Sequence, residues 1–265
     1  MTARSQRFLF WAIVWFCILI LSVPTVIVVG ASFTTANMIS FPPEGFTLKW
    51  YEKIALARDL QQAFIRSLFV STVCLIVSVP IGTLAGLALA RFRIRFSNMV
   101  QVYLLLPFTI PLIGSGIGMM LIFGEWRILG SLWPIGVALA VINLPFIIWS
   151  VSSAAGSLDS DLELAASSCG AGRFETFWYV TLPGVMPGVI TGGLLMFVLA
   201  MSEFLVSLLL TDARTVTLPV QIYNNIRSII TPDLAAVSSV FVIIALFAVW
   251  LLDRLVGLEI FLKSK

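Results

Sequence analysis

Long apolar runs separated by short polar stretches dominate the sequence. Reading for runs of roughly 20 apolar residues, the length of helix that crosses a bilayer, gives six stretches: residues 8–30, 64–90, 100–123, 132–153, 188–210 and 235–257. The pattern predicts an all-α membrane protein in which six transmembrane helices form one domain over residues 1–265. An even number of spans places both termini on the same side of the membrane.

Prolines interrupt two of these spans. Pro107 and Pro111 lie in the third span, and Pro134 and Pro145 lie in the fourth. Proline removes a backbone N–H donor and lipid supplies no replacement, so the freed carbonyls need neighbouring helices or water. We therefore expect the third and fourth spans to be irregular and to lie in the interior of the bundle.

Small residues spaced four apart recur within the spans, a spacing that allows two helices to approach closely in lipid. They are Gly82 and Gly86, Gly114 and Gly118, and Gly184, Gly188 and Gly192. This spacing predicts tight helix packing and says little about function.

The composition fits a membrane protein and excludes several classes of function. Hydrophobic residues make up 60% of the chain and charged residues 11%, against about 25% charged in soluble domains. A dispersed net charge of +3 gives no reason to expect nucleic acid as a partner. The chain has no histidine and no CxxC pair, so we expect no metal site. It also lacks the GxxxxGK[ST] loop that cradles nucleotide phosphates, so it is not itself an ATPase, and we expect no cofactor in it.

The basic residues predict the orientation. With the N-terminus inside, nine of the sixteen lysines and arginines lie on the inner side. The short loop "RFRIRFSN" after the second span carries Arg91, Arg93 and Arg95, and short loops are where the positive-inside rule holds best. We therefore expect a multi-pass protein with both termini in the cytoplasm. The polar stretch at about residues 156–185 then also faces the cytoplasm.

One outer loop predicts a short helix. The segment "FTLKWYEKIA" places Phe46, Trp50, Tyr51 and Ile54 at helical spacing. Such a helix is typical of an interfacial anchor with its aromatic side chains at headgroup level. A contact surface for an external partner is the alternative.

The segment "ELAASSCGAGRFETFWYVTLP", residues 163–183, is a polar, small-residue island between long apolar runs. Ser160 and Glu163 fit a capping box, which predicts that a helix begins there. Asp161 favours the same helix N-terminus through the helix dipole. Gly170 and Gly172 are suited to end that helix and turn the chain.

A second short helix is predicted from Arg173 until Pro183 ends it. It carries Phe174, Phe177 and Trp178 on neighbouring turns. The two helices form a compact amphipathic unit in the cytosol. On these grounds alone it is either a capped loop that returns the chain to the membrane or a docking surface.

The same segment resembles the cytoplasmic EAA loop of the permease subunits of bacterial ATP-binding cassette (ABC) importers of the binding-protein-dependent kind. The residues that match the motif are Ala165, Ala166, Gly170, Leu182 and Pro183. The glutamate position of the motif is occupied by Leu164, and Glu163 stands one residue earlier. The spacing from Gly170 to Pro183 is the more specific part of the match.

The resemblance extends over most of the chain. The segments "FPPEGFTLKWYEKI", "LARFRIRF", "LPVQIY" and "TPDLAAVSS" are similar to the subgroup of these permeases that serves spermidine and putrescine importers and relatives for other small amines. The resemblance implies a permease in the bacterial inner membrane that pairs with a second permease, a different chain. It also implies a cytoplasmic ATPase dimer that binds ATP and Mg²⁺, and a periplasmic substrate-binding protein.

For the EAA loop the resemblance implies that a coupling helix seats in a groove of the ATPase and transmits its closure to spans four and five. The residues we assign to this coupling are Asp161, Glu163, Leu164, Ala165, Ala166, Gly170, Phe174, Leu182 and Pro183.

A single acidic residue lies deep within a span. Glu203 is about 15 residues beyond Gly188 and so roughly 22 Å along a helix, in the outer half of the fifth span. A carboxylate in hydrocarbon is costly, so it faces the bundle interior or a water-filled cavity. Ser202 and Glu203 are our candidates for the solute pathway. A structural ion pair is the alternative, and one carboxylate leaves a diamine, a monoamine and an amino acid derivative open as solutes.

Two competing classes remain to be weighed. A membrane enzyme is disfavoured because the chain has no histidine to serve as a general base. A self-sufficient channel or secondary transporter for a small cation is the other alternative. It is disfavoured because only Glu203 lies deep in a span and no internal repeat is evident.

Overall fold

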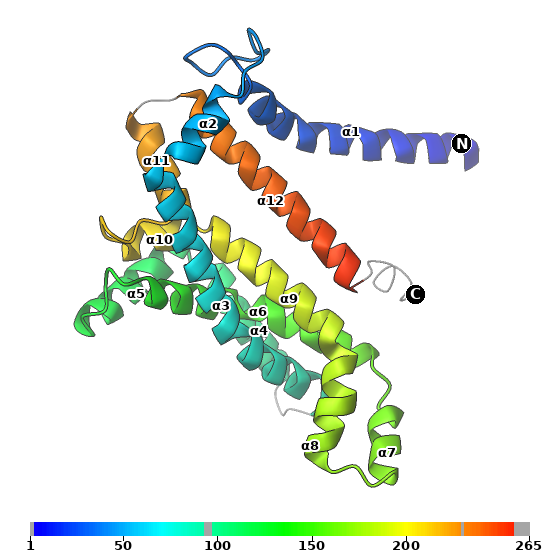
Figure 1. Cartoon of the computed structure of the whole chain (residues 1–265). Coiled ribbons are helices and arrows are strands. Elements are labelled where there is room, and N and C mark those ends of the chain that lie inside the picture. The colour runs from blue at the N-terminus through cyan, green and yellow to red at the C-terminus, as the bar shows by residue number, and fades with distance from the viewer. Residues whose placement is uncertain (1–2, 93–96, 229–230, 257–265) are drawn as a thin grey trace. The chain divides into compact units, whose positions relative to one another are not determined.

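The computed structural model describes residues 3–92, 97–228 and 231–256, and these form helices and turns with no strand (Figure 1). The described residues divide into two compact units. One comprises those of 1–61 and 222–247, and the other those of 62–221 and 248–265.

The first unit contains α1 (Ala3–Ala31), α2 (Lys49–Leu56) and most of α12 (Pro232–Val256). The predicted short outer helix is present as α2. Its Trp50 is buried and donates from Nε1 to the carbonyl of Thr34 at 2.7 Å. Lys53 forms a 2.7 Å salt bridge with Asp233 at the start of α12. Trp50 therefore anchors α2 within its own unit, whereas Phe46 is 82% exposed.

The second unit holds the remaining helices. In chain order they are α3 (Arg58–Arg91), α4 (Ser97–Thr109), α5 (Leu112–Glu125), α6 (Leu132–Ser157), α7 (Asp161–Ser168), α8 (Arg173–Thr176), the π turn η1 (Phe177–Thr181), α9 (Leu182–Ser202), α10 (Leu205–Leu210) and α11 (Leu218–Ser228). Residues 58–61 of α3 belong to the first unit, and α11 passes into it from residue 222.

The pairing of α6 with α9 forms the core of this second unit. Ile135, Leu139, Ile147 and Met196 are among its fully buried side chains. The two helices are close because Gly188 has no side chain: a Cβ there would lie 2.7 Å from the Ser150 carbonyl oxygen. The Ser150 hydroxyl in turn donates to the Gly188 carbonyl at 2.8 Å. The predicted tight packing is confirmed here, but Gly118 has no neighbour within 4 Å of such a Cβ.

Each of the two proline-containing spans agrees with the prediction in one respect and differs in another. The third span is broken at Ile110 and Pro111 into α4 and α5, as an irregular helix should be, yet most described side chains of α5 are exposed on this chain. The fourth span is interior, but α6 runs through Pro145 without a break. The expected irregularity does not take the form of a break. Pro145 is buried, and α6 packs against α9 and α10.

Four helical stretches in the described part of the chain are long and apolar enough to cross a membrane. They are Leu9–Ala31, Arg58–Arg91, Leu132–Ser157 and Arg173–Ser202. Leu112–Glu125 and Pro232–Ile244 are shorter apolar helices. The fifth predicted span is not one helix, because α9 ends at Ser202 and α10 begins at Leu205.

Candidate coupling loop and solute pathway

Residues 156–185, hereafter called the coupling loop after their predicted role, run from the end of α6 through α7, which lies beside α8 at one end of α9 (Figure 1). The predicted capping box is wrong: Ser160 precedes α7 but makes no side-chain cap, and Glu163 turns elsewhere. The Asp159 carboxylate takes over the role and accepts from the Asp161 N–H at 2.9 Å. The sequence pattern was ambiguous because aspartate and serine both favour helix starts.

The end of α7 follows the prediction. Gly170 has a φ of +89°, a backbone conformation that costs little only for glycine. The Ala171 N–H bonds to the Ala166 carbonyl at 3.1 Å, and the Gly170 N–H bonds to the Ser167 carbonyl at 3.0 Å. This pair of bonds is a Schellman motif, and it satisfies carbonyls that the end of a helix would otherwise leave unpaired.

The second helix starts as predicted but does not end at Pro183. Glu175 caps it, since its carboxylate accepts from the Gly172 N–H at 2.8 Å. The helix then widens into the π turn η1, where the Leu182 N–H bonds to the Phe177 carbonyl five residues back, and continues as α9. Proline needs no N–H partner and fits the first turn of the helix that follows. Pro183 therefore lies where the π turn η1 changes into the regular α-helix α9.

Glu163 connects three segments of the second unit. Its Oε1 accepts from Arg91 Nη2 at 3.2 Å, at the end of α3, and from Thr181 Oγ1 at 2.9 Å, in η1. Thr181 is buried, and about a quarter of each charged side chain is exposed. Neither Arg91 nor Thr181 was among the predicted site residues. Arg91 could be noticed only as a basic loop residue, and Thr181 gave no signal in the sequence.

The other predicted coupling residues do not converge on one contact. Most are exposed: Asp161, Leu164, Ala165, Gly170, Phe174 and Pro183. Ala166 and Leu182 are half-buried, and Leu182 packs against the α6–α9 core. The exposed apolar side chains on the coupling loop are large: Leu162 at 50%, Leu164 at 64%, Phe174 at 74%, Trp178 at 49% and Tyr179 at 81%. These five residues are called the apolar face of the loop below.

The candidate pathway residues lie at the other end of α9, about 30 Å from the coupling loop at 1.5 Å per residue. Glu203 occupies the break between α9 and α10 and caps α10. Its Oε1 accepts from the Val206 N–H at 2.9 Å, and its Oε2 accepts from the Ser207 N–H at 2.9 Å and the Ser207 hydroxyl at 3.2 Å. Ser202 is exposed and donates to carbonyls of its own helix.

The cap changes how Glu203 can act. The alternative is that Glu203 forms a structural ion pair. No salt bridge involves Glu203 among the described residues. A carboxylate has about four acceptor sites, and the three bonds to α10 use one on Oε1 and two on Oε2. One acceptor site on Oε1 therefore has no donor among the residues that the structure describes.

The two ends of α3 are tied to different loops. Near its start, Ser67 Oγ accepts from the Leu218 N–H at 2.8 Å, and Arg91 pairs with Glu163 at its end. These contacts lie about 36 Å apart along the helix, slightly more than the thickness of a hydrocarbon core.

In the loop before Leu218, hydrogen bonds from the Thr215 hydroxyl and then from the Arg214 N–H lower the pKa of Asp212 below its ordinary value.

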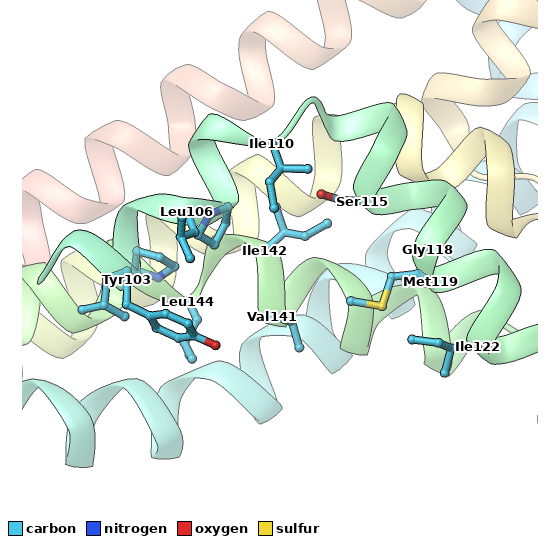
Figure 2. Close-up of a pocket in the computed structure, with 13 residues that line it drawn as sticks. Tyr103, Leu106, Ile110, Ser115, Gly118, Met119, Ile122, Val141, Ile142 and Leu144 are labelled. Atoms are coloured by element: carbon cyan, nitrogen blue, oxygen red, sulfur yellow. The ribbon is translucent and has the colours of Figure 1, made fainter. Parts of the chain in front are cut away.

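An apolar cavity of about 460 Å³ lies between α4, α5 and α6. Figure 2 shows Tyr103 and Leu106 from α4 and Ile110 from the break after it facing the cavity, with residues of α5 and α6 on the other sides. None of its lining residues is charged. It is therefore unsuited to hold a small cation, and its only sequence signal is the proline pair that breaks the third span.

The long apolar helices indicate an integral membrane protein, and comparison with known proteins identifies its family. Residues 78–257 match the family described as binding-protein-dependent transport system inner membrane component. The chain is 28% identical over 229 residues to the spermidine/putrescine transport system permease protein PotC of Escherichia coli K12, covering 86% of each chain. It is 30% identical over 205 residues to the molybdenum transport system permease protein ModB of Mycobacterium tuberculosis, covering 71% of this chain and 77% of that one.

A solved structure shares the fold. The crystal structure of a bacterial ABC transporter involved in the import of the acidic polysaccharide alginate contains a chain that matches with a TM-score of 0.69 and 17% identity, over 95% of this chain and 97% of that one. The protein belongs to the family of binding-protein-dependent transport system inner membrane components, and it is a permease subunit of a bacterial ABC importer.

Proposed function

We propose that this permease forms half of the pathway of an ATP-driven importer for a small amine-type solute, a polyamine or a related amine. It would cross the inner membrane six times, with α4 and α5 together as the third span and α12 as the sixth. Both termini would be cytoplasmic. The second half of the pathway would come from a different permease chain, and an external binding protein would deliver the solute.

The observation that carries the proposal is the build of the coupling loop. The five large side chains of its apolar face are exposed, although the loop is polar in sequence and stands at the end of α9. Two of them, Phe174 and Trp178, are in ring contact, and exposed apolar side chains that lie together are typical of a protein contact. The Schellman motif at Gly170 and the Glu175 cap stabilise the ends of the two short helices. A helix that transmits a rigid-body motion requires such a fixed conformation.

The chemistry of the loop describes the groove that would receive it. Phe174 and Trp178 pack edge to face, with ring centroids 6.1 Å apart, and fit an apolar floor. Asp161 and Glu175 are exposed on the same loop, with Arg173 as the one exposed base between residues 159 and 185. We therefore expect a cytoplasmic ATPase, which binds ATP and Mg²⁺, to offer a groove with an apolar floor and a predominantly basic rim.

The assignment of an amine rests on Glu203. Identity to relatives does not select a solute, since one is named for spermidine and putrescine and another for molybdenum. A carboxylate with one unused acceptor site at a break between helices suits a cationic group. It would act as a ligand on the pathway, with Ser202 beside it.

Affinity purification of the tagged chain from its native membrane in mild detergent, with mass identification of what accompanies it, tests the proposal. Recovery of a second multispan protein and an ATPase with a phosphate-binding loop is the expected result. Their absence, together with transport by the isolated chain in vesicles, would refute the proposal and favour a self-sufficient channel or secondary transporter.

A further inference from the structure

Helix α7 is held in place in an unusual way for an element that would transmit force. It buries no residue completely, so hydrophobic packing does not fix it as it fixes α6 and α9. It touches α8 and η1, which follow it in the chain. The side chain that reaches beyond them to α3 is Glu163, through Arg91.

We propose that Arg91, Glu163 and Thr181 form a three-way polar contact that makes α3 and α9 move together with the coupling loop. Arg91 and Thr181 would be positioning residues, acting through Glu163 without touching the ATPase. The inference rests on the proposed coupling function and deepens it. It adds α3 to the two spans that directly continue the coupling loop.

The geometry supports one shared acceptor. The Arg91 guanidinium and the Thr181 hydroxyl both donate to Glu163 Oε1, at 3.2 and 2.9 Å. Arg91 Nε is buried without an acceptor among the described residues, and Glu163 is the one acceptor that the guanidinium has among them. Partial burial reduces screening by solvent, which makes such a pair worth more than one on an open surface.

The mechanical consequence follows from where the three residues stand. Arg91 is the last residue of α3, a helix of 34 residues and thus about 50 Å long. Thr181 directly precedes α9, which is packed along α6. A displacement of Glu163 therefore acts on the ends of two long helices at once. Without the contact, α7 could shift while α3 stays in place.

Two threonines in the same segment provide a matched test. Thr176 and Thr181 are both buried, but the Thr176 hydroxyl has no partner in the described part of the chain. Thr181→Val removes the bond to Glu163 together with a long, 3.5 Å bond to the Thr176 carbonyl, whereas Thr176→Val removes an unpaired hydroxyl of the same size. Arg91→Met removes the charge, and Arg91→Glu with Glu163→Arg restores the pair in reverse.

The measurement is the number of solute molecules imported per ATP hydrolysed. It is made on the complete complex in proteoliposomes with the binding protein and a radiolabelled polyamine. We expect Thr181→Val and Arg91→Met to lower this ratio about 2- to 30-fold, the range seen for residues that modulate coupling. Thr176→Val should leave it at the wild-type value, and the charge reversal should recover part of the loss.

Failure of the inference and failure of the proposed function give different results. An unchanged ratio in Thr181→Val and Arg91→Met, in complexes that still contain the ATPase, would overturn the inference alone. An equal loss in Thr176→Val would also overturn it, because the effect would then come from the segment and not from the bond. A wild-type chain that does not bind an ATPase would overturn the proposed function and the inference with it.

Discussion

Replacing Gly170 tests whether the shape of the coupling loop matters for transport. Its φ of +89° is strained for any residue with a Cβ, yet a Cβ there would have no neighbour within 4 Å. The cost of Gly170→Val is therefore conformational, without a steric clash. It amounts to about 1–3 kcal/mol for a non-glycine residue held in such a conformation. That is enough to shift a local equilibrium about 5- to 150-fold away from the Schellman ending.

The assay is solute-stimulated ATPase activity and uptake of the reconstituted complex. We expect the loss to be largest for Gly170→Val, smaller for Gly170→Ala and least for Gly170→Asn, because asparagine tolerates positive φ best of the three. Gly118→Val is the control: that site is equally open but lies in α5, outside the coupling loop, without a positive φ. Wild-type stimulation and uptake in Gly170→Val would refute the reasoning. So would equal defects in the two valine variants.

Two further predictions concern Glu203 and Gly188. Glu203→Gln should lower amine uptake about 5-fold or more while the complex still assembles, since a carboxylate attracts a cation 4 Å away by about 1–4 kcal/mol. Glu125→Gln, at an exposed glutamate, is its control, and normal uptake by Glu203→Gln would remove this residue from the pathway. Gly188→Ala should reduce the amount of folded protein in the membrane, because its Cβ would lie 2.6 Å from the Ala154 Cβ, and such overpacking costs about 1–3 kcal/mol. Gly118→Ala has no such neighbour, and equal amounts of the two variants by fluorescence-detected chromatography would contradict the packing argument.

Much of this structure could be predicted from local pattern. Apolar runs located the long helices, and the turn at Gly170 was predictable because glycine is the residue that adopts positive φ at low cost. The same local logic failed at Ser160 and Glu163. A capping box is a contact within four residues, and Glu163 instead bonds to Arg91, 72 positions away. No spacing rule encodes a partner at that distance.

The helix breaks show a similar limit. Glu203 stood out as a lone acid in an apolar run, but its role as a cap depends on the turn of the backbone between α9 and α10, which hydropathy does not contain. Pro145 and Pro183 were expected to disturb their helices. Instead, α6 continues through Pro145, and Pro183 follows the wide π turn η1 in a helix that continues as α9. Both outcomes depend on the surrounding structure.

The π turn at Phe177–Thr181 also has a consequence for how sequences of this kind diverge. Each residue in an α-helix advances about 100° around the axis. One extra residue in η1 therefore rotates the side chains that precede it about the helix axis, relative to the side chains of α9. Deleting a single residue there would leave the helix continuous but turn Phe174 and its neighbours by about a quarter of a revolution relative to Gly188. Length in this short segment is thus expected to vary far less than composition, and a one-residue deletion is expected to be more harmful than most substitutions.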